Sequence, residues 1–432
     1  MDSVWRKTIS LPQFESLQGD VKTDVLVIGG GITGILCAYF LKERGIDCLL
    51  VERDRLCHGV TGNTTAKITA QHGLIYNKLF RHAGLEKTKL YLEANWWAIR
   101  KYEELAGSID CDFAEKTAYV YSLDDPRKLE QEAMIYGILG LDDKIVDTPE
   151  LPFATAGALQ MTNQAQFHLL KFLSAIVKDL KIYEHSFVKE LLPNKAVTEQ
   201  GSITYQQVIF ATHYPMDNKH GFYFLKLYQH RSYVIALEHA AQMEGMYVDE
   251  ARKGMSFRSY DNLLLVGGGS HRTGKKGGNW QELREFAKQY YPDAAEKYAW
   301  AAQDCMPLDG APYIGAYSPA MPGCYVATGF QKWGMTSAMV SAMLLADMVQ
   351  GIENPYAAVF KPSRNIFTKQ LFCNGAEAVL NLLTPTVPRC PHLGCALKWN
   401  AAEHSWDCPC HGSRFTREGK LLDNPANGNK KM

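Results

Sequence analysis

The spacing of apolar residues changes along the first part of the chain. Residues 24–28 read DVLVI, and their continuous apolar run is typical of a strand buried on both faces. Residues 35–44 carry apolar side chains at helical spacing and end before Gly45. Residues 48–51 form a second apolar run that finishes at Glu52. The pattern therefore predicts a strand, a helix and a second strand that ends on an acid.

The turn between the first strand and the helix is rich in glycine, because residues 29–34 read GGGITG. Gly29 permits a tight turn, Gly31 lets the backbone approach a pyrophosphate, and Gly34 allows the helix to pack closely on the strand. The amides at the start of the helix face the phosphate charge, and Glu52 accepts hydrogen bonds from a ribose hydroxyl. The arrangement predicts a dinucleotide site and does not by itself choose between FAD and NAD.

A second strand-to-helix turn lies much later in the chain. Residues 324–328 form a short apolar strand that runs through Gly329 and Gly334 into a helix from about 335 to 350. The N-terminus of that helix points back at the sheet, where its dipole stabilises negative charge.

The composition is that of an ordinary globular protein. Its 432 residues suggest two or three domains of about 150 residues each, and 46% hydrophobic residues are ample for a large core. Equal numbers of basic and acidic residues, 46 of each, argue against nucleic acid or an anionic membrane as the main partner. No apolar run approaches about 18 residues. The N-terminus lacks the features of a signal peptide, so we expect no membrane span and a cytoplasmic location.

Four of the 11 cysteines crowd into two short loops near the C-terminus. Residues 390–395 read CPHLGC and residues 408–413 read CPCHGS, so each loop offers a cysteine and a histidine. Thiolate with imidazole suits zinc or an iron–sulfur cluster, and the spacing alone leaves both open. The other seven cysteines are dispersed and mostly read as small apolar residues.

Several segments resemble the D-amino-acid-oxidase-like superfamily of FAD-dependent oxidoreductases. The resemblance implies FAD as the cofactor and a discontinuous, Rossmann-like α/β FAD-binding domain with an inserted antiparallel α+β substrate domain. The strand-like stretches 229–238, 245–249 and 262–268 fit the sheet of that inserted domain. The segments that carry the resemblance are residues 4–6, 61–67, 208–212, 307–315, 325–330 and 334–336.

The resemblance runs from about residue 4 to residue 352 and divides the chain into an oxidoreductase, residues 1–370, and a C-terminal remainder. A nicotinamide site would need a second fingerprint, and residues 265–272 place Arg272 where its third glycine belongs. Within the oxidoreductase we expect FAD-binding segments at roughly 20–95, 155–215 and 300–352, and a substrate domain at roughly 96–154 and 216–299.

The residues expected to hold the FAD come from the glycine turn, from the end of the second strand, and from the segments that carry the resemblance. They are Gly29, Gly31, Ile32, Thr33, Gly34, Glu52, Arg53, Thr64, Thr65, Ala66, Val188, Ala211, Thr212, Gly329, Gly334, Met335 and Thr336.

Candidate catalytic residues follow the first of these segments. Lys67 could place a cation near the flavin and stabilise its reduced anion, and His72 could face the ring, although a histidine there is more often structural. Arg231, Tyr233 and Arg258 lie on expected strands of the substrate domain and could clamp a substrate carboxylate, although solvated strand residues look the same in a sequence. A helix from 166 to 180 is expected to pack His168 in the core.

The cysteine loops resemble a Rieske domain, in which two histidines replace two cysteines on one iron of a [2Fe–2S] cluster. The resemblance implies that Cys390 and Cys408 bind one iron, that His392 and His411 bind the other, and that Cys395 forms a disulfide with Cys410. The resemblance implies an all-β domain at residues 375–432. Here the sequence departs from the family, because residues 370–383 lack the alternation of the strands that usually precede the first ligand loop, so we expect an abbreviated domain. Ser413 keeps one usual hydrogen-bond donor to the cluster, whereas Phe415 replaces a tyrosine and should lower the potential.

The pair of centres predicts an electron relay, because a flavin takes electrons in pairs and can release them singly. The resemblance implies an amine or amino acid as the substrate, oxidised at a C–N bond. The partner would be a one-electron acceptor or donor, either a protein or a quinone. Two alternatives use the same parts: a reductase fed by a ferredoxin-like donor, and a non-catalytic redox sensor or electron-transfer module.

Overall fold

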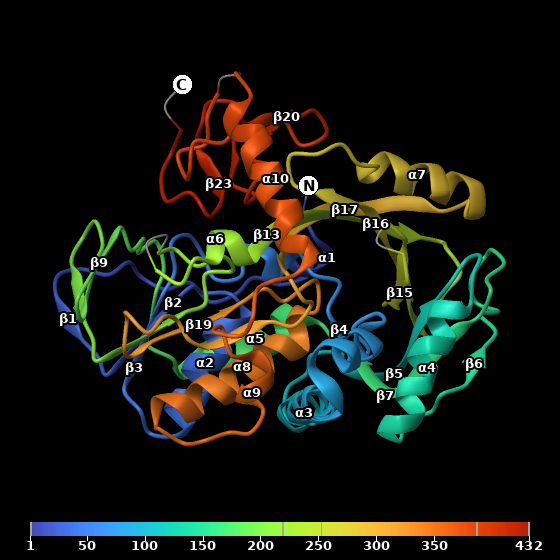
Figure 1. Ribbon diagram of the computed structural model, residues 1–432, viewed down its shortest axis with the longest axis horizontal. Helices are drawn as coiled ribbons and strands as arrows, with labels where there is room; N and C mark the ends of the chain where they lie inside the picture. The colour runs from blue at the N-terminus through green and yellow to red at the C-terminus, as the bar shows by residue number, and fades with distance from the viewer. Residues whose placement is uncertain (1, 218–219, 252, 386–387, 431–432) are drawn as a thin grey trace.

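The apolar runs predicted as strands pair in a six-stranded sheet with the order β18-β19-β12-β2-β3-β8. The computed structural model describes residues 2–217, 220–251, 253–385 and 388–430 (Figure 1). All four residues of β2 and of β3 are buried, which explains their continuous apolar sequence. The strands are β2 (Val25–Ile28), β3 (Cys48–Val51), β8 (Ile182–Tyr183), β12 (Gln207–Phe210), β18 (Tyr313–Ala316) and β19 (Cys324–Thr328). All neighbours are parallel except β18 and β19.

Helices cover this sheet. The helix predicted after the glycine turn is α2 (Ile32–Glu43), and the helix predicted near residue 335 is α8 (Gly334–Val349), most of whose residues are buried. The shorter neighbours are α1 (Val4–Thr8), η1 (Val60–Asn63), α5 (Leu169–Ile176), η2 (Val177–Asp179) and α9 (Ala357–Phe360). A four-stranded sheet, β1-β11-β10-β9, is built from β1 (Val21–Lys22), β9 (Glu190–Leu192), β10 (Lys195–Val197) and β11 (Ser202–Thr204).

A nine-stranded sheet contains the three strands expected for the substrate domain. Its order is β17-β13-β16-β15-β14-β5-β7-β4, with β6 paired to β7. Its strands are β4 (Lys67–Ile68), β5 (Ala114–Tyr121), β6 (Ile145–Val146), β7 (Ala158–Gln166), β13 (Leu227–Glu238), β14 (Met246–Asp249), β15 (Ser256–Tyr260), β16 (Leu263–Arg272) and β17 (Ala295–Pro307). β7 and most of β17 come from segments that the sequence assigns to FAD binding, so chain segments on both sides of that expected division share one sheet.

Helices flank the nine-stranded sheet: α3 (Ile75–Ala106), α4 (Arg127–Leu139), α6 (Tyr223–Lys226) and α7 (Asn279–Tyr290). The expected helix from 166 to 180 is shorter, because Gln166 ends β7 and α5 begins at Leu169. His168 is the N-cap residue of α5, accepts a hydrogen bond from the amide of Lys171, and is fully buried. Its packing role is therefore confirmed, and its placement inside the helix is wrong.

The C-terminal residues form a separate small sheet domain, drawn in red on the upper side of the molecule in Figure 1. Its antiparallel strands are β20 (Lys398–Asn400), β21 (Ser405–Asp407), β22 (Arg414–Phe415) and β23 (Leu421–Asp423). α10 (Lys369–Leu383) precedes it, where the sequence shows no strand alternation. A helix thus occupies the segment where a longer domain of this kind would have strands.

None of the helices within the described residues combines the length and the apolar character that crossing a membrane requires.

Candidate functional site: a flavin cavity beneath a cysteine–histidine domain

A cavity of about 840 Å³ lies between the glycine turn, the nine-stranded sheet and the C-terminal domain. Its walls include the turn after β2, the end of β3, the loop before β4, strands β13 and β17, and the turn into α8. Residues of the C-terminal domain also line it: Lys420, Leu421, Leu422, Asp423, Asn424, Ala426 and Asn427. Its surface therefore comes from both parts of the chain.

The glycine turn has the geometry that the sequence predicts. Gly29 has a φ of +113°, and a Cβ there would lie 2.5 Å from the carbonyl oxygen of Ala211. A Cβ on Gly34 would collide with the carbonyl oxygen of Gly29, so the helix can lie this close to the strand only with glycine. The amide of Ile32 donates to Thr61 Oγ1 at 3.0 Å at the start of α2.

Glu52 directly follows β3 and lies at the edge of the same cavity. Its carboxylate accepts hydrogen bonds from the amides of Gly30 at 2.6 Å and Asp54 at 2.9 Å. Burial raises the pKa of Glu52, and these two amides oppose the rise. A carboxylate accepts about four hydrogen bonds, so Glu52 can also receive a ribose hydroxyl.

Most residues expected to hold FAD line the cavity. Gly34, Ala66 and Thr336 lie behind its surface: Gly34 packs on the turn, the carbonyl of Ala66 accepts from Arg258, and Thr336 contacts His72. Those on the surface are Gly29, Gly31, Ile32, Thr33, Glu52, Arg53, Thr64, Thr65, Val188, Ala211, Thr212, Gly329, Gly334 and Met335. The cavity volume, the glycine turn and the dipole at the start of α2 fit a flavin dinucleotide.

Lys67 and His72 both reach the cavity but differ in their surroundings. Burial lowers the pKa of Lys67 to about 7, and the neighbouring Arg258 acts in the same direction. His72 uses both ring nitrogens, with Nδ1 at 2.6 Å from Tyr91 Oη and Nε2 at 2.8 Å from the carbonyl of Thr69. Burial lowers the pKa of His72 to about 3, so the ring is neutral and fixed. These contacts favour the structural alternative for His72.

The residues considered for a carboxylate clamp have other partners. Arg231 Nε donates to Glu403 of the C-terminal domain at 2.9 Å, and Tyr233 donates to the same carboxylate at 2.8 Å. Arg258 is fully buried, donates to the carbonyl of Ala66 at 2.7 Å, and lies over the ring of Trp5. The clamp hypothesis is therefore wrong for Arg231, whose guanidinium is paired with Glu403. For Arg258 it stays a prediction, because Nε and Nη2 are buried without a hydrogen-bond partner among the described residues.

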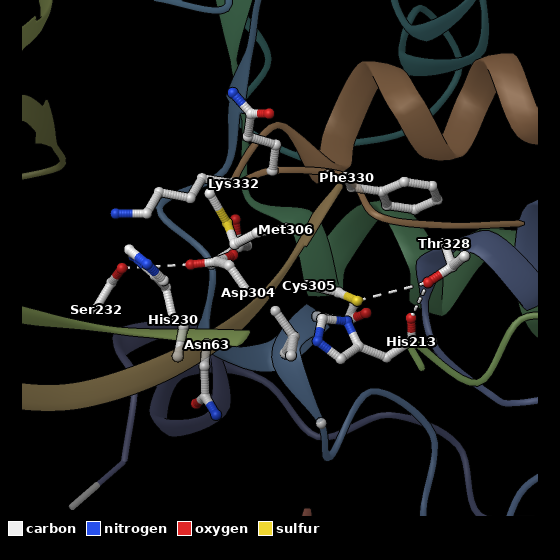
Figure 2. A pocket seen from close by; sticks show the side chains of 18 of the residues that line it. Asn63, His213, His230, Ser232, Asp304, Cys305, Met306, Thr328, Phe330 and Lys332 are labelled. Carbon is white, nitrogen blue, oxygen red and sulfur yellow. Dashed lines mark hydrogen bonds between the residues drawn. The ribbon is translucent and has the colours of Figure 1, made fainter. Parts of the chain in front are cut away.

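Figure 2 shows a part of the cavity that the sequence did not single out. Ser232 Oγ donates to Asp304 Oδ2 at 3.3 Å, and Ser270 Oγ donates to Ser232 at 3.3 Å. Lys332 Nζ donates to Ser270 at 3.0 Å. His213 lies on the same surface and has a φ of +66°, an uncommon backbone conformation for a residue other than glycine. Asp304 lies three residues before the expected segment 307–315, and only the pairing of β13 with β17 reveals its neighbours.

The two cysteine–histidine loops meet beside the cavity. Cys395 and Cys410 form the expected disulfide, and their sulfur atoms lie within 4.8 Å of the sulfur of Cys408. The rings of His392 and His411 are 4.9 Å apart between centroids. Cys390 contacts Cys408, and this contact, followed by Ser413, lowers the pKa of Cys390 to about 7. The two thiols thus lie in contact with each other, and so do the two imidazole rings.

The donor set fits the expected [2Fe–2S] cluster. Cys390 and Cys408 are buried, and so is His411, whose Nδ1 has no hydrogen-bond partner among the residues that the structure covers. A buried imidazole nitrogen without a partner is costly unless it binds a ligand. Phe415 is fully buried in the apolar cluster around these cysteines. Both observations fit a metal centre that is buried on the side of His411, whereas His392 is half-buried.

Three side chains of the nine-stranded sheet hold the second cysteine–histidine loop. Arg272 donates to the carbonyls of Pro409 at 2.9 Å and Cys410 at 3.0 Å. Gln229 donates to the carbonyl of His411 at 2.9 Å, and Gln303 donates to that of Gly412 at 2.9 Å. The oxidoreductase therefore supplies the support that the abbreviated domain lacks.

The comparisons with known proteins agree with both parts. The sequence model of the FAD dependent oxidoreductase (DAO) family matches residues 24–348, and that of the Rieske [2Fe-2S] domain matches residues 382–431. The chain therefore belongs to the DAO family of FAD-dependent oxidoreductases and carries a C-terminal Rieske domain. With these domains it has binding sites for FAD and for a [2Fe–2S] cluster.

Relatives extend the match over the whole chain. YhfW of Bacillus subtilis (strain 168), whose name describes a Rieske 2Fe-2S iron-sulfur protein, is 33% identical over 98% of this chain and 96% of its own length. Glycine oxidase from Geobacillus kaustophilus superposes with a TM-score of 0.67 and 18% identity over 80% of this chain and 99% of that chain. L-proline dehydrogenase from P. horikoshii superposes with a TM-score of 0.67 and 16% identity over 81% of this chain and 98% of that chain. At these identities, the two structures establish the fold alone.

Proposed function

We propose that this chain is a dehydrogenase that oxidises the C–N bond of an amine or amino acid at FAD and passes the electrons singly, through its Rieske cluster, to an external acceptor. The acceptor is a protein or a quinone, and the location is the cytoplasm. The names of the structural neighbours, glycine oxidase and L-proline dehydrogenase, support a C–N substrate.

The observation that carries the proposal is the shared cavity. Asn424 of the C-terminal domain donates to the carbonyls of Thr212 at 2.7 Å and Tyr214 at 2.9 Å, directly beside the expected flavin contacts. The ring of Tyr214 lies 6.2 Å from that of His392. A Rieske domain that served only an outside partner would need no contact with this cavity, so the docking supports transfer within the chain.

The residues of the chain have separable tasks in this proposal. The glycine turn and Glu52 would hold the dinucleotide, and the N-terminus of α8 would stabilise negative charge on the flavin. Lys67 would add a positive charge below about pH 7, because that is where its pKa lies. Cys390, Cys408, His392 and His411 would hold the cluster. When bound, FAD supplies hydride acceptance and the cluster supplies one-electron transfer.

Anaerobic mixing with a panel of amines and amino acids tests the proposal on the purified holoprotein. We expect one substrate class to bleach the flavin absorbance, followed by the electron paramagnetic resonance signal of a reduced Rieske cluster. Cys390→Ser should keep the bleaching and lose that signal. If no amine or amino acid bleaches the flavin, the proposal fails. If reduced ferredoxin reduces the cluster before the flavin, the relay runs in the opposite direction.

A further inference from the structure

A line of polar side chains crosses the inner end of the cavity. It runs from Lys332 through Ser270 and Ser232 to Asp304, with successive donor–acceptor distances of 3.0, 3.3 and 3.3 Å. Each donor points along the line toward Asp304. The carboxylate of Asp304 thus receives the last hydrogen bond, and the charge of Lys332 balances it from the far end.

The fold holds this line in place from four elements. Ser232 lies on β13, Ser270 on β16 and Asp304 on β17, three hydrogen-bonded strands of one sheet. Lys332 lies in the short loop before α8, where Gly329, Gln331 and Lys332 have φ values of +74°, +48° and +72°. Left-handed conformations at non-glycine residues persist only where the surroundings enforce them. The loop therefore presents Lys332 to the cavity at a conformational cost.

Asp304 is placed to meet a ligand. It is deep in the molecule, and the part of its surface that stays accessible faces the cavity beside His230 and Lys332 (Figure 2). Ser232 occupies one of the about four positions at which a carboxylate accepts a hydrogen bond. Burial raises the pKa of Asp304, whereas Lys332, His213, Ser232 and Arg231 lower it. A cation that reached the carboxylate would also favour its charged form.

Three of the basic side chains near this end are paired, set back from the cavity surface or only partly charged. Arg231 is paired with Glu403, and Arg258 is buried beneath Trp5 outside the cavity surface. Lys67 is charged only in part at neutral pH, because burial lowers its pKa to about 7. Lys332 donates to Ser270 and so takes part in the line that ends on Asp304.

We infer that Asp304 is the binding residue for the ammonium group of the substrate. This end of the cavity then selects a cationic amine rather than the carboxylate of an amino acid. Ser232 is a positioning residue that orients the Asp304 carboxylate. The inference rests on the proposed function and narrows its substrate class.

The test uses three size-matched probes on the FAD-loaded full chain: tert-butylammonium, pivalate and tert-butanol. The carbon attached to nitrogen in tert-butylammonium carries no hydrogen, so it cannot be oxidised at the C–N bond. Each probe is titrated while the flavin absorbance spectrum is recorded. Because no electron is transferred, the result does not depend on whether the chain oxidises amines at all.

We expect tert-butylammonium to perturb the flavin spectrum and to bind more tightly than pivalate or tert-butanol. Asp304→Asn should weaken its binding by about tenfold or more, because a charged hydrogen bond is lost. Ser232→Ala should weaken it by about threefold, and Ser232→Thr, which keeps the hydroxyl, should restore it. Asp293→Asn, at an exposed aspartate after α7, is the control and should change nothing.

Two outcomes would overturn the inference. One is pivalate binding at least as tightly as tert-butylammonium. The other is tert-butylammonium binding that does not differ between the native chain and Asp304→Asn. This outcome includes the case in which neither chain binds it measurably. Anaerobic bleaching by an oxidisable amine would then still support the proposed function. Tight binding of the ammonium probe without bleaching by any amine would support the role of Asp304 and not the proposed function.

Discussion

Glu403 links the Rieske domain to the oxidoreductase through hydrogen bonds, and the variant Glu403→Gln tests how much this link contributes to stability. Its carboxylate accepts from Arg231 at 2.9 Å, from Tyr233 at 2.8 Å and from Arg414 at 2.8 Å. Arg231 comes from β13 and Arg414 from β22, so one carboxylate joins two sheets. The side chains of all three charged residues are less than a tenth exposed. Glutamine keeps the shape and removes the anion that pairs with the buried guanidinium of Arg231, whereas Arg414 keeps Asp407 and Asp423.

The expected cost follows from the pKa of Glu403. Arg231 and Arg414 outweigh burial and lower it from 4.5 to about 2. At about 1.36 kcal/mol for each pKa unit, the difference corresponds to about 3 kcal/mol. Removing one partner of a buried ion pair typically costs about 3–5 kcal/mol, which agrees. Because the pKa is lowered, this stability is present above pH 4.5 and is lost as the pH falls toward 2.

Urea unfolding of the FAD-loaded chain measures the effect. Flavin fluorescence follows release from the cavity, and cluster absorbance follows the Rieske domain. In Glu403→Gln the transition followed by cluster absorbance should occur at a lower urea concentration. The free energy of unfolding extrapolated to water should fall by about 3 kcal/mol. Flavin release should move with it, because residues 420–427 line the cavity.

Glu296→Gln is the matched control. Glu296 accepts both hydrogen bonds of Arg284 at 2.8 Å, in the same bidentate geometry, but their side chains are 29% and 42% exposed. A surface pair of this kind contributes about 0–1 kcal/mol. If the two variants lose equal stability, or if Glu403→Gln moves neither transition, the reasoning from burial is refuted.

Three further outcomes follow from the site. Gly34→Ala should yield protein without bound FAD, measured as the flavin-to-protein absorbance ratio, because its Cβ would collide with the carbonyl of Gly29; a bound flavin would contradict this. Cys390→Ser should contain flavin but no Rieske signal by electron paramagnetic resonance, and a retained signal would exclude Cys390 as a ligand. In the native chain the charge of Lys67 is lost as the pH rises through about 7, so the flavin midpoint potential should fall more steeply there than in Lys67→Met; parallel pH profiles would show that Lys67 does not act on the flavin.

The sequence was sufficient to predict strands that are buried on both faces, because all of their residues are apolar. β2 and β3 are buried on both faces, so their apolar runs were sufficient to identify them, and the glycine turn has one geometry that fits its residues. The two cysteine–histidine loops were equally clear, because each loop carries its chemistry within six residues.

Long-range pairing accounts for what the sequence did not predict. Arg231 looks like a substrate contact in isolation, yet its partner Glu403 lies 172 residues further along the chain. Asp304 became visible only when β13, β16 and β17 lay side by side. His168 was displaced from its expected helix because Gln166 pairs in a strand with Lys67. In each case a tertiary partner decides the role, and local spacing contains no record of that partner.

The cavity wall made by residues 420–427 sets an order of assembly. These residues are synthesised after the glycine turn and after both halves of the large sheet, so the wall is the last to be added. A flavin in the cavity would border this segment, so its contacts on that side depend on the docked C-terminal domain. Retention of the flavin is thereby coupled to the fold around the cysteine loops.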